Sequence, residues 1–191
     1  MSALPAPHAP DELPPGVVER ARRGDEDAFA AVVRHHDHGL RALAYRLLGD
    51  RDRMDDALQE AYVRAFRALP RFRGDSRLGT WLYRIAYNAC LDELERSRRR
   101  DHLPLREAAE PPDPRAGPAE EVASRRDLAA ALAALPPEDR AAVLMVDAHG
   151  FGYRDAGEAL GVPEGTVASR LSRARAALRR ALAETEGVPE R

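Results

Sequence analysis

The chain has 191 residues, which is enough for one ordinary domain or two small ones. Hydrophobic residues make up 44% of it but aromatic residues only 5%, a balance that favours closely packed helices over a sheet protein. No apolar run approaches the roughly 18 residues of a membrane span, the start lacks a signal-peptide pattern, and the single Cys90 excludes an internal disulfide. We therefore expect a cytoplasmic protein with no direct membrane insertion.

The chain begins with a proline-rich arm. Five prolines within the first 16 residues are incompatible with regular structure, so we expect a disordered arm over residues 1–25. A helical pattern starts near Phe29 and ends at Gly49, and a second helix with a continuous apolar stripe ends at Pro70. Together with a third helix, these form the predicted first domain, residues 26–100.

The third helix follows a predicted loop over residues 71–79, and Thr80 is its expected N-cap. Its apolar positions recur at helical spacing and form one stripe for burial. A different face of this helix carries Trp81, Arg84 and Asn88. An exposed tryptophan beside an arginine and an asparagine has no packing explanation, so this face is a candidate binding surface.

Prolines and acidic residues then dominate residues 101–126, which predicts a flexible linker. Beyond it the pattern predicts a short helix ending near Leu135, another ending at Gly150, a two-turn helix over residues 153–160 and a long helix over 164–183. These helices form the predicted second domain, residues 127–184, and residues 185–191 form a tail. We predict an all-α fold of two small helical domains joined by a flexible linker.

The last two helices match a helix-turn-helix. Gly157 is small enough for the second helix to approach, Gly161 supplies the sharp turn, and Val167 packs inward. The remaining face of the second helix would enter a DNA major groove with Thr166, Ser169, Arg170, Ser172 and Arg173. The alternative is an arginine-rich helix that packs on a protein partner, and the turn residues argue against it.

A formal net charge of −2 conceals two basic segments. Residues 70–100 hold eight Arg against four acids, and residues 165–183 hold five Arg and no acid. The stretch between them is acidic. Two cationic segments joined by an acidic one favour a protein that contacts a polyanion twice, and helix surfaces that simply collect arginines are the alternative.

Several motifs stand in the order found in one bacterial family. Leu-Pro-Pro at 135–137, Gly-Thr-Val at 165–167 and Ser-Arg-Leu at 169–171 resemble region 4 of bacterial sigma factors of the extracytoplasmic-function (ECF) class. Asp-Ala-Leu-Gln-Glu at 56–60 resembles their region 2.2, and residues 72–75 and 80–88 resemble regions 2.3 and 2.4. Within the class, the chain is most similar to the actinobacterial sigma-M group.

This resemblance implies an alternative RNA polymerase sigma factor, which directs core polymerase to specific promoters and helps open the minus-10 element. The beta-prime clamp helices would contact the first domain at Asp56, Gln59, Glu60 and Val63. The minus-10 DNA would contact Trp81, Arg84, Tyr87 and Asn88. The second domain would bind the beta flap, and would contact the minus-35 DNA through Arg140, Thr166, Ser169, Arg170, Ser172 and Arg173.

The resemblance also implies control by an anti-sigma factor, often a membrane protein, that sequesters the two domains. One departure from the family pattern concerns Ala168, because the family commonly has Lys or Arg there; we expect one minus-35 contact to be absent.

Two other classes of function compete with this interpretation. A stand-alone helix-turn-helix regulator needs neither a polymerase-binding face around Gln59 nor a base-capturing Trp81. An enzyme is disfavoured because the chain has no recognisable nucleophile motif. His35, His36 and His38 lie too close together on one helix to converge on one metal ion. We expect no catalytic residue, no metal and no cofactor.

Overall fold

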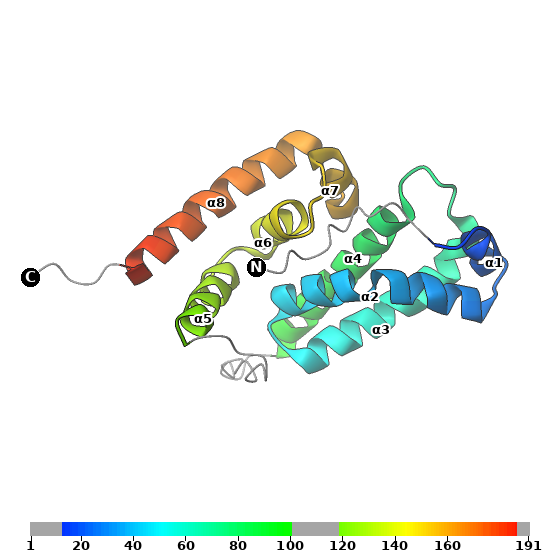
Figure 1. Ribbon diagram of the computed structural model, residues 1–191, viewed down its shortest axis with the longest axis horizontal. Helices are drawn as coiled ribbons and strands as arrows, with labels where there is room; N and C mark the ends of the chain where they lie inside the picture. Colours follow the sequence, from blue (N-terminus) through cyan, green and yellow to red (C-terminus); the bar gives the residue numbers. More distant parts are fainter. Residues whose placement is uncertain (1–12, 101–118, 187–191) are drawn as a thin grey trace, which may run out of the picture.

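The computed structural model describes residues 13–100 and 119–186, which form helices and connecting turns with no β-strand among them (Figure 1). The predicted all-α fold is confirmed. We call residues 13–100 the N-terminal domain and residues 119–186 the C-terminal domain.

The N-terminal domain consists of α1 (Val17–Arg22), α2 (Glu26–Leu48), α3 (Arg51–Ala68), a 3₁₀ turn η1 (Leu69–Arg71) and α4 (Leu78–Arg100). Side-chain caps fix where two of these helices begin. Asp25 accepts a hydrogen bond from the Ala28 amide at 2.9 Å, and Asp50 accepts one from the Arg53 amide at 2.9 Å. Gly49 ends α2 in a left-handed conformation with φ 69°, as its place in the sequence predicts.

The prediction of a disordered arm over residues 1–25 is wrong for its last third. Helix α1 forms directly after the last proline of the arm and buries Ala21 against α2. Arg20 donates to Asp25 at 2.7 Å and ties this helix to the N-cap of α2. Residues 1–12 lie outside the described residues.

Thr80 is not the N-cap of α4. The helix begins two residues earlier, at Leu78, and the Trp81 amide already donates to the carbonyl oxygen of Arg77 at 3.0 Å. Leu78 is buried, so packing of this apolar side chain draws the first turn into the domain. Thr80 is itself buried within that turn.

The C-terminal domain consists of α5 (Ala119–Ala133), α6 (Pro137–Val143), a π-helical turn η2 (Leu144–Ala148), α7 (Tyr153–Leu160) and α8 (Glu164–Glu186). Helix α5 begins inside the segment predicted to be a linker, directly after Pro118. The chain there reads Ala-Glu-Glu-Val-Ala, a run of mostly strong helix formers with acids in the first turn. The remainder of the expected linker, residues 101–118, lies outside the described residues.

The predicted helix-turn-helix is present at α7 and α8. Gly161 turns the chain with φ 69°, and Val167 is fully buried. A Cβ atom on Gly157 would lie 2.7 Å from the carbonyl oxygen of Val162, so only glycine permits this close approach. Helix α8 runs three residues beyond its predicted end.

The two domains pack against each other. Helix α4 lies against α7, and α2 lies against α5 and α6 (Figure 1). Buried apolar residues of both domains belong to one hydrophobic cluster. The arrangement brings the helix-turn-helix next to the helix expected to bind minus-10 DNA.

Candidate nucleic-acid and polymerase interfaces

The row of residues expected to bind polymerase lies exposed along α3. Asp56, Gln59, Glu60 and Val63 all face solvent, and the Val63 side chain is unusually open for an apolar residue at 38% exposed. The spacing of three and four residues places them on one side of the helix. This surface therefore offers carboxylates, an amide and an apolar group together.

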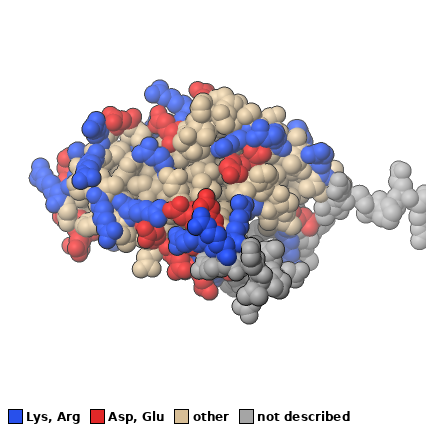
Figure 2. All heavy atoms as spheres, turned by 180° about the vertical axis from the view of Figure 1, so that it is seen from behind, with Lys and Arg blue, Asp and Glu red and all other residues tan. Residues whose placement is uncertain are grey.

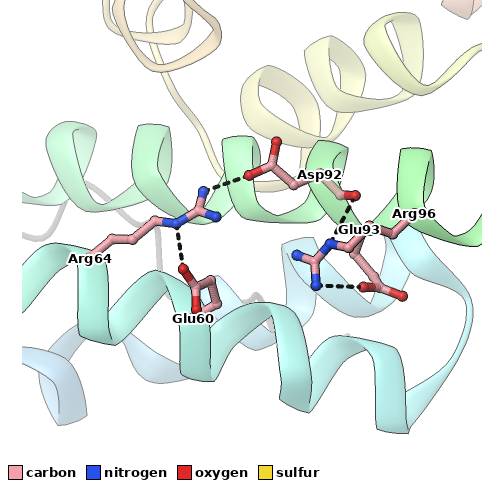
Figure 3. Close-up of polar contacts among 5 residues, drawn as sticks. All are labelled: Glu60, Arg64, Asp92, Glu93 and Arg96. Carbon is pink, nitrogen blue, oxygen red and sulfur yellow. Dashed lines mark hydrogen bonds and ion pairs between the residues drawn. The ribbon is translucent and has the colours of Figure 1, made fainter.

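Arg64 joins this surface to α4. Its guanidinium donates to Glu60 at 2.9 Å and to Asp92 at 2.6 Å, and both carboxylates raise the pKa of Arg64 (Figure 3). One turn further along α4, Arg96 lies 3.3 Å from the buried Glu93. The Arg64–Asp92 contact joins α3 to α4, whereas the Arg96–Glu93 pair lies within α4. Local sequence patterns do not predict the contact between Arg64 and Asp92, which lie 28 positions apart.

Helix α4 exposes only two of the four residues expected to bind the minus-10 element. Arg84 and Asn88 face solvent, but Trp81 is 8% and Tyr87 is 2% exposed. The prediction of an exposed Trp81 is wrong, because its ring packs 5.1 Å from that of Phe72 in the preceding loop. Helical periodicity describes one helix at a time and therefore misses contacts made by a loop.

Trp81 nevertheless lines a hollow of about 400 Å³. Its other lining residues include Phe72 and three arginines from the N-terminal domain, Arg71, Arg73 and Arg84. Glu158 of α7 lines the same hollow from the C-terminal domain. The site combines aromatic rings with cations, which is the combination that binds unstacked bases and their phosphates.

The helix expected to read minus-35 DNA has an exposed polar face. Ser169, Ser172 and Arg173 are exposed, whereas Thr166 and Arg170 are partly buried. The Ser169 hydroxyl donates to the carbonyl oxygen of Thr166 at 2.9 Å. The sequence places these side chains near the amino end of the second helix, and the structure keeps most of them accessible.

Acids outside α8 offset part of its positive charge. Arg173 donates through two nitrogens to Asp139 of α6, at 2.8 and 3.1 Å, and Arg175 makes a similar fork to Asp147 of η2, at 2.5 and 3.0 Å. Hydrogen bonding to these carboxylates raises the pKa of both arginines. Charge counted along the sequence overstates the cationic character of this helix. Figure 2 likewise shows acidic side chains between the arginines of the visible face.

Arg140 does not lie on the recognition face. Its guanidinium donates to the carbonyl oxygens of Leu47, at 3.0 Å, and Arg46, at 3.4 Å, which end α2 in the other domain. It also donates to Leu135, at 3.0 Å, and to Ala133. In this arrangement Arg140 is not available to the DNA backbone, because both terminal nitrogens of its guanidinium donate to carbonyl oxygens and its Nε is buried.

No metal site is found among the described residues, in which no group of three or more His, Cys, Asp or Glu side chains could hold an ion. The rings of His35 and His36 contact each other edge to face at 4.8 Å. None of the described helices is both long enough and apolar enough to cross a membrane.

Comparison with known proteins identifies the class of protein. Sigma-70 region 2 matches residues 32–100, and sigma-70 region 4 matches residues 125–178. The two helical domains are therefore those of an RNA polymerase sigma factor. The ECF sigma factor SigM of Mycobacterium tuberculosis is 42% identical over 83% of this chain and 79% of its own, and the ECF sigma-E factor of Escherichia coli is 34% identical over 85% and 90%.

The chain belongs to the ECF class of the sigma-70 family, and the expected likeness to the actinobacterial sigma-M group is confirmed. It is an RNA polymerase sigma factor that directs promoter-specific transcription initiation, in a family that is not enzymatic. The match to region 2 excludes the alternative of a stand-alone helix-turn-helix regulator, which would lack this domain.

Two solved structures resemble the whole arrangement. The sigma factor RpoE of Bartonella quintana, in complex with the anti-sigma factor NepR, superposes with a TM-score of 0.70, at 28% identity, over 81% of this chain and 96% of its own. The protein CnrH, in complex with the cytosolic domain of CnrY, superposes with a TM-score of 0.67, at 26% identity, over 90% and 97%. Each superposition extends over a larger share of this chain than one domain contains, so it includes residues of both domains.

Proposed function

We propose that the three candidate surfaces divide the work of initiation among them. Helix α4 and the hollow beside it bind the minus-10 element, α8 binds the minus-35 element, and the exposed side of α3 binds the clamp helices of the beta-prime subunit. The observation that carries this proposal is the hollow of about 400 Å³, whose lining combines two aromatic rings with three arginines and two acids.

Opening a promoter requires that a base leave the stack, at a cost of a few kcal/mol. Trp81 and Phe72 offer an apolar surface to such a base, while Arg71, Arg73 and Arg84 attract the neighbouring phosphates. Asn88 is exposed further along the same helix and can donate to and accept from a base edge. Tyr87 takes part once the C-terminal domain moves away.

For the minus-35 element, Ser169, Ser172 and Arg173 are accessible and carry groups that hydrogen-bond to base edges and phosphates. Thr166 and Arg170 then contact the backbone. Arg140 joins them only when its bonds to α2 are released.

The remaining proposed partners are proteins. The row on α3 suits the clamp helices because Val63 adds an apolar contact to three polar ones, and the C-terminal domain binds the beta flap. In the solved structures RpoE is in complex with the anti-sigma factor NepR, and CnrH is in complex with the cytosolic domain of CnrY. We propose that an anti-sigma factor likewise binds this chain, and that it holds the protein at the membrane when the anti-sigma factor is itself a membrane protein.

Run-off transcription with core polymerase tests the minus-10 assignment, on a promoter first mapped from transcript starts in cells that overproduce the protein. Asn88→Ala is expected to lower transcription from duplex promoter, and a template already unpaired over the minus-10 element should restore most of it. Glu95→Ala, which changes an exposed residue of the same helix, serves as the control. Equal activity of Asn88→Ala and wild type on duplex DNA would refute the assignment.

A further inference from the structure

The arginines that line the hollow beside α4 form no salt bridges. Arg71 and Arg73, before α4, and Arg84, within it, are all exposed, and none makes an ion pair within the part of the chain that the structure describes. By contrast, Arg64 and Arg173 are each paired with a carboxylate. Like charges that share one hollow repel each other, so a bound anion would stabilise this cluster.

The remaining walls of the hollow suit the other parts of a nucleotide. The rings of Phe72 and Trp81, whose centroids are 5.1 Å apart, offer apolar surface to a base. Thr80 lines the same hollow, and its buried hydroxyl oxygen has no hydrogen-bond partner among the described residues. Small-ligand sites have volumes of about 300–1,000 Å³. A hollow of about 400 Å³ therefore admits a free nucleotide as well as one base of a DNA strand.

Two carboxylates of the lining narrow the choice of base. Asp75 is exposed in the loop before α4, whereas Glu158 of α7 is half-buried and lies 3.6 Å from its ion-pair partner Arg154, too far for a good hydrogen bond. An ionised carboxylate only accepts hydrogen bonds, so it selects a base edge that donates. Guanine presents two neighbouring donors there, N1–H and the N2 amino group, whereas adenine and cytosine each present one amino group. Glu158 therefore favours guanine.

We propose that the hollow binds a free guanine nucleoside polyphosphate. The phosphates contact the three unpaired arginines, the base lies against the two aromatic rings, and Glu158 accepts hydrogen bonds from N1 and N2 of the guanine. Three guanidinium groups contact more than one phosphate, so GTP should bind more tightly than guanosine.

The nucleotide and the minus-10 element would occupy the same place. This consequence rests on the minus-10 role proposed for α4, whereas the nucleotide site itself does not. A guanine held against the two rings leaves no room there for an unstacked base of the promoter. A saturating guanine nucleotide should therefore weaken the binding of single-stranded DNA to the chain.

Trp81 reports binding in the hollow because it is the only tryptophan of the chain. The full chain is titrated with GTP in magnesium-free buffer, which leaves the phosphates open to the arginines, and the fluorescence of Trp81 is followed. N-acetyltryptophanamide under the same conditions corrects for light absorbed by the nucleotide. Isothermal titration calorimetry gives the affinity independently. ATP, guanosine and tripolyphosphate are the comparison ligands.

Three variants locate the site. Arg73→Ala removes one cation of the hollow, and Arg179→Ala, which removes an exposed arginine of α8 outside it, is the matched control. We expect Arg73→Ala to weaken GTP binding about tenfold, because hydrogen bonds to a charged group are lost, and Arg179→Ala to leave it unchanged. GTP should bind about tenfold more tightly than ATP, and Glu158→Gln should remove this preference.

An unchanged Trp81 signal and no heat with GTP would overturn the site. Equal affinities for GTP, ATP and tripolyphosphate, or equal GTP affinities of Arg73→Ala and Arg179→Ala, would also overturn it, because they indicate attraction of any polyanion by surface charge.

Anisotropy of a labelled single-stranded DNA of mixed sequence tests the competition separately. If GTP binds but leaves a measurable DNA affinity unchanged, the competition is wrong. If GTP binds and the chain binds no DNA, the minus-10 role of α4 fails and the nucleotide site stands.

Discussion

Nη1 of Arg140 lies 3.0 Å from the carbonyl oxygen of Leu47, so a cation of the C-terminal domain caps a helix of the N-terminal domain. The last carbonyl groups of a helix lack partners within the helix and carry partial negative charge. Arg140 supplies donors to two of them, at Arg46 and Leu47, while it also binds the turn that follows α5. A residue expected to bind DNA thus joins the two domains.

Arg140→Ala should destabilise the chain because it leaves several carbonyl oxygens without a donor. Hydrogen bonds from a charged group contribute about 1.5–3 kcal/mol, so we expect a loss of about 2 kcal/mol in the free energy of unfolding. Urea denaturation followed by circular dichroism measures it. Arg67→Ala, an exposed arginine of α3, should change the value by less than about 0.5 kcal/mol. Equal stability of the two variants would contradict the capping role.

Asp139→Asn should change how α8 binds DNA. The substitution removes the negative charge that pairs with Arg173 at 2.8 and 3.1 Å, so this arginine is free to contact another phosphate. Binding of non-specific duplex DNA should tighten, and the dependence of its affinity on salt should steepen by about one phosphate contact. Titrations at several salt concentrations measure this slope. A slope identical to that of wild type would show that Asp139 does not restrain Arg173.

Acid should weaken the contact between the domains through His149. Burial, and then the nearby Arg46 and His38 of α2, lower the pKa of His149 from 6.5 to about 4. Tyr83 of α4 faces His149 and supplies no charge that would oppose this shift. Because the unfolded chain binds this proton more readily, stability falls as the pH drops from about 6.5 towards 4.

At pH 5 the expected loss from this group is about 2 kcal/mol relative to pH 7. Urea denaturation at the two pH values measures it. In His149→Gln the difference between pH 7 and pH 5 should shrink by that amount. An unchanged pH dependence in this variant would contradict the assignment.

Two glycines of the helix-turn-helix should respond oppositely to alanine. At Gly157 the added Cβ would meet a backbone oxygen at 2.7 Å, and such overpacking costs about 1–3 kcal/mol. At Gly165 nothing lies within 4 Å of the new atom, so the better helix propensity of alanine should raise stability by up to about 1 kcal/mol. Thermal denaturation of both variants compares them directly. A Gly157→Ala protein as stable as wild type would contradict the close approach of the helices.

Local signals predicted the helix-turn-helix well because its determinants lie within a few residues of one another. Gly161 turns the chain, and Gly157 has no Cβ that would clash with the backbone at Val162. Val167 is buried between the helices. The row on α3 was predictable for a similar reason, since the periodicity of this one helix is enough to assign each residue to its exposed or its buried side.

Contacts between distant segments were not predictable in this way. Trp81 is buried by Phe72 from a loop, and Arg140 bonds to residues more than 90 positions away in the chain. The sequence gives the residue types at these positions, but the partner depends on how the domains pack. For the same reason, the sequence predicted the cations of α8 but did not predict that the carboxylates of Asp139 and Asp147 pair with two of them.

Footprinting on a mapped promoter tests whether the two domains bind the minus-35 and minus-10 elements only when the chain is mounted on polymerase. With core polymerase present, we expect protection at both the minus-35 and minus-10 elements, and Ser172→Ala combined with Arg173→Ala should weaken the upstream protection. The chain alone at the same concentration should protect neither element. Protection of both elements by the chain alone would contradict the account.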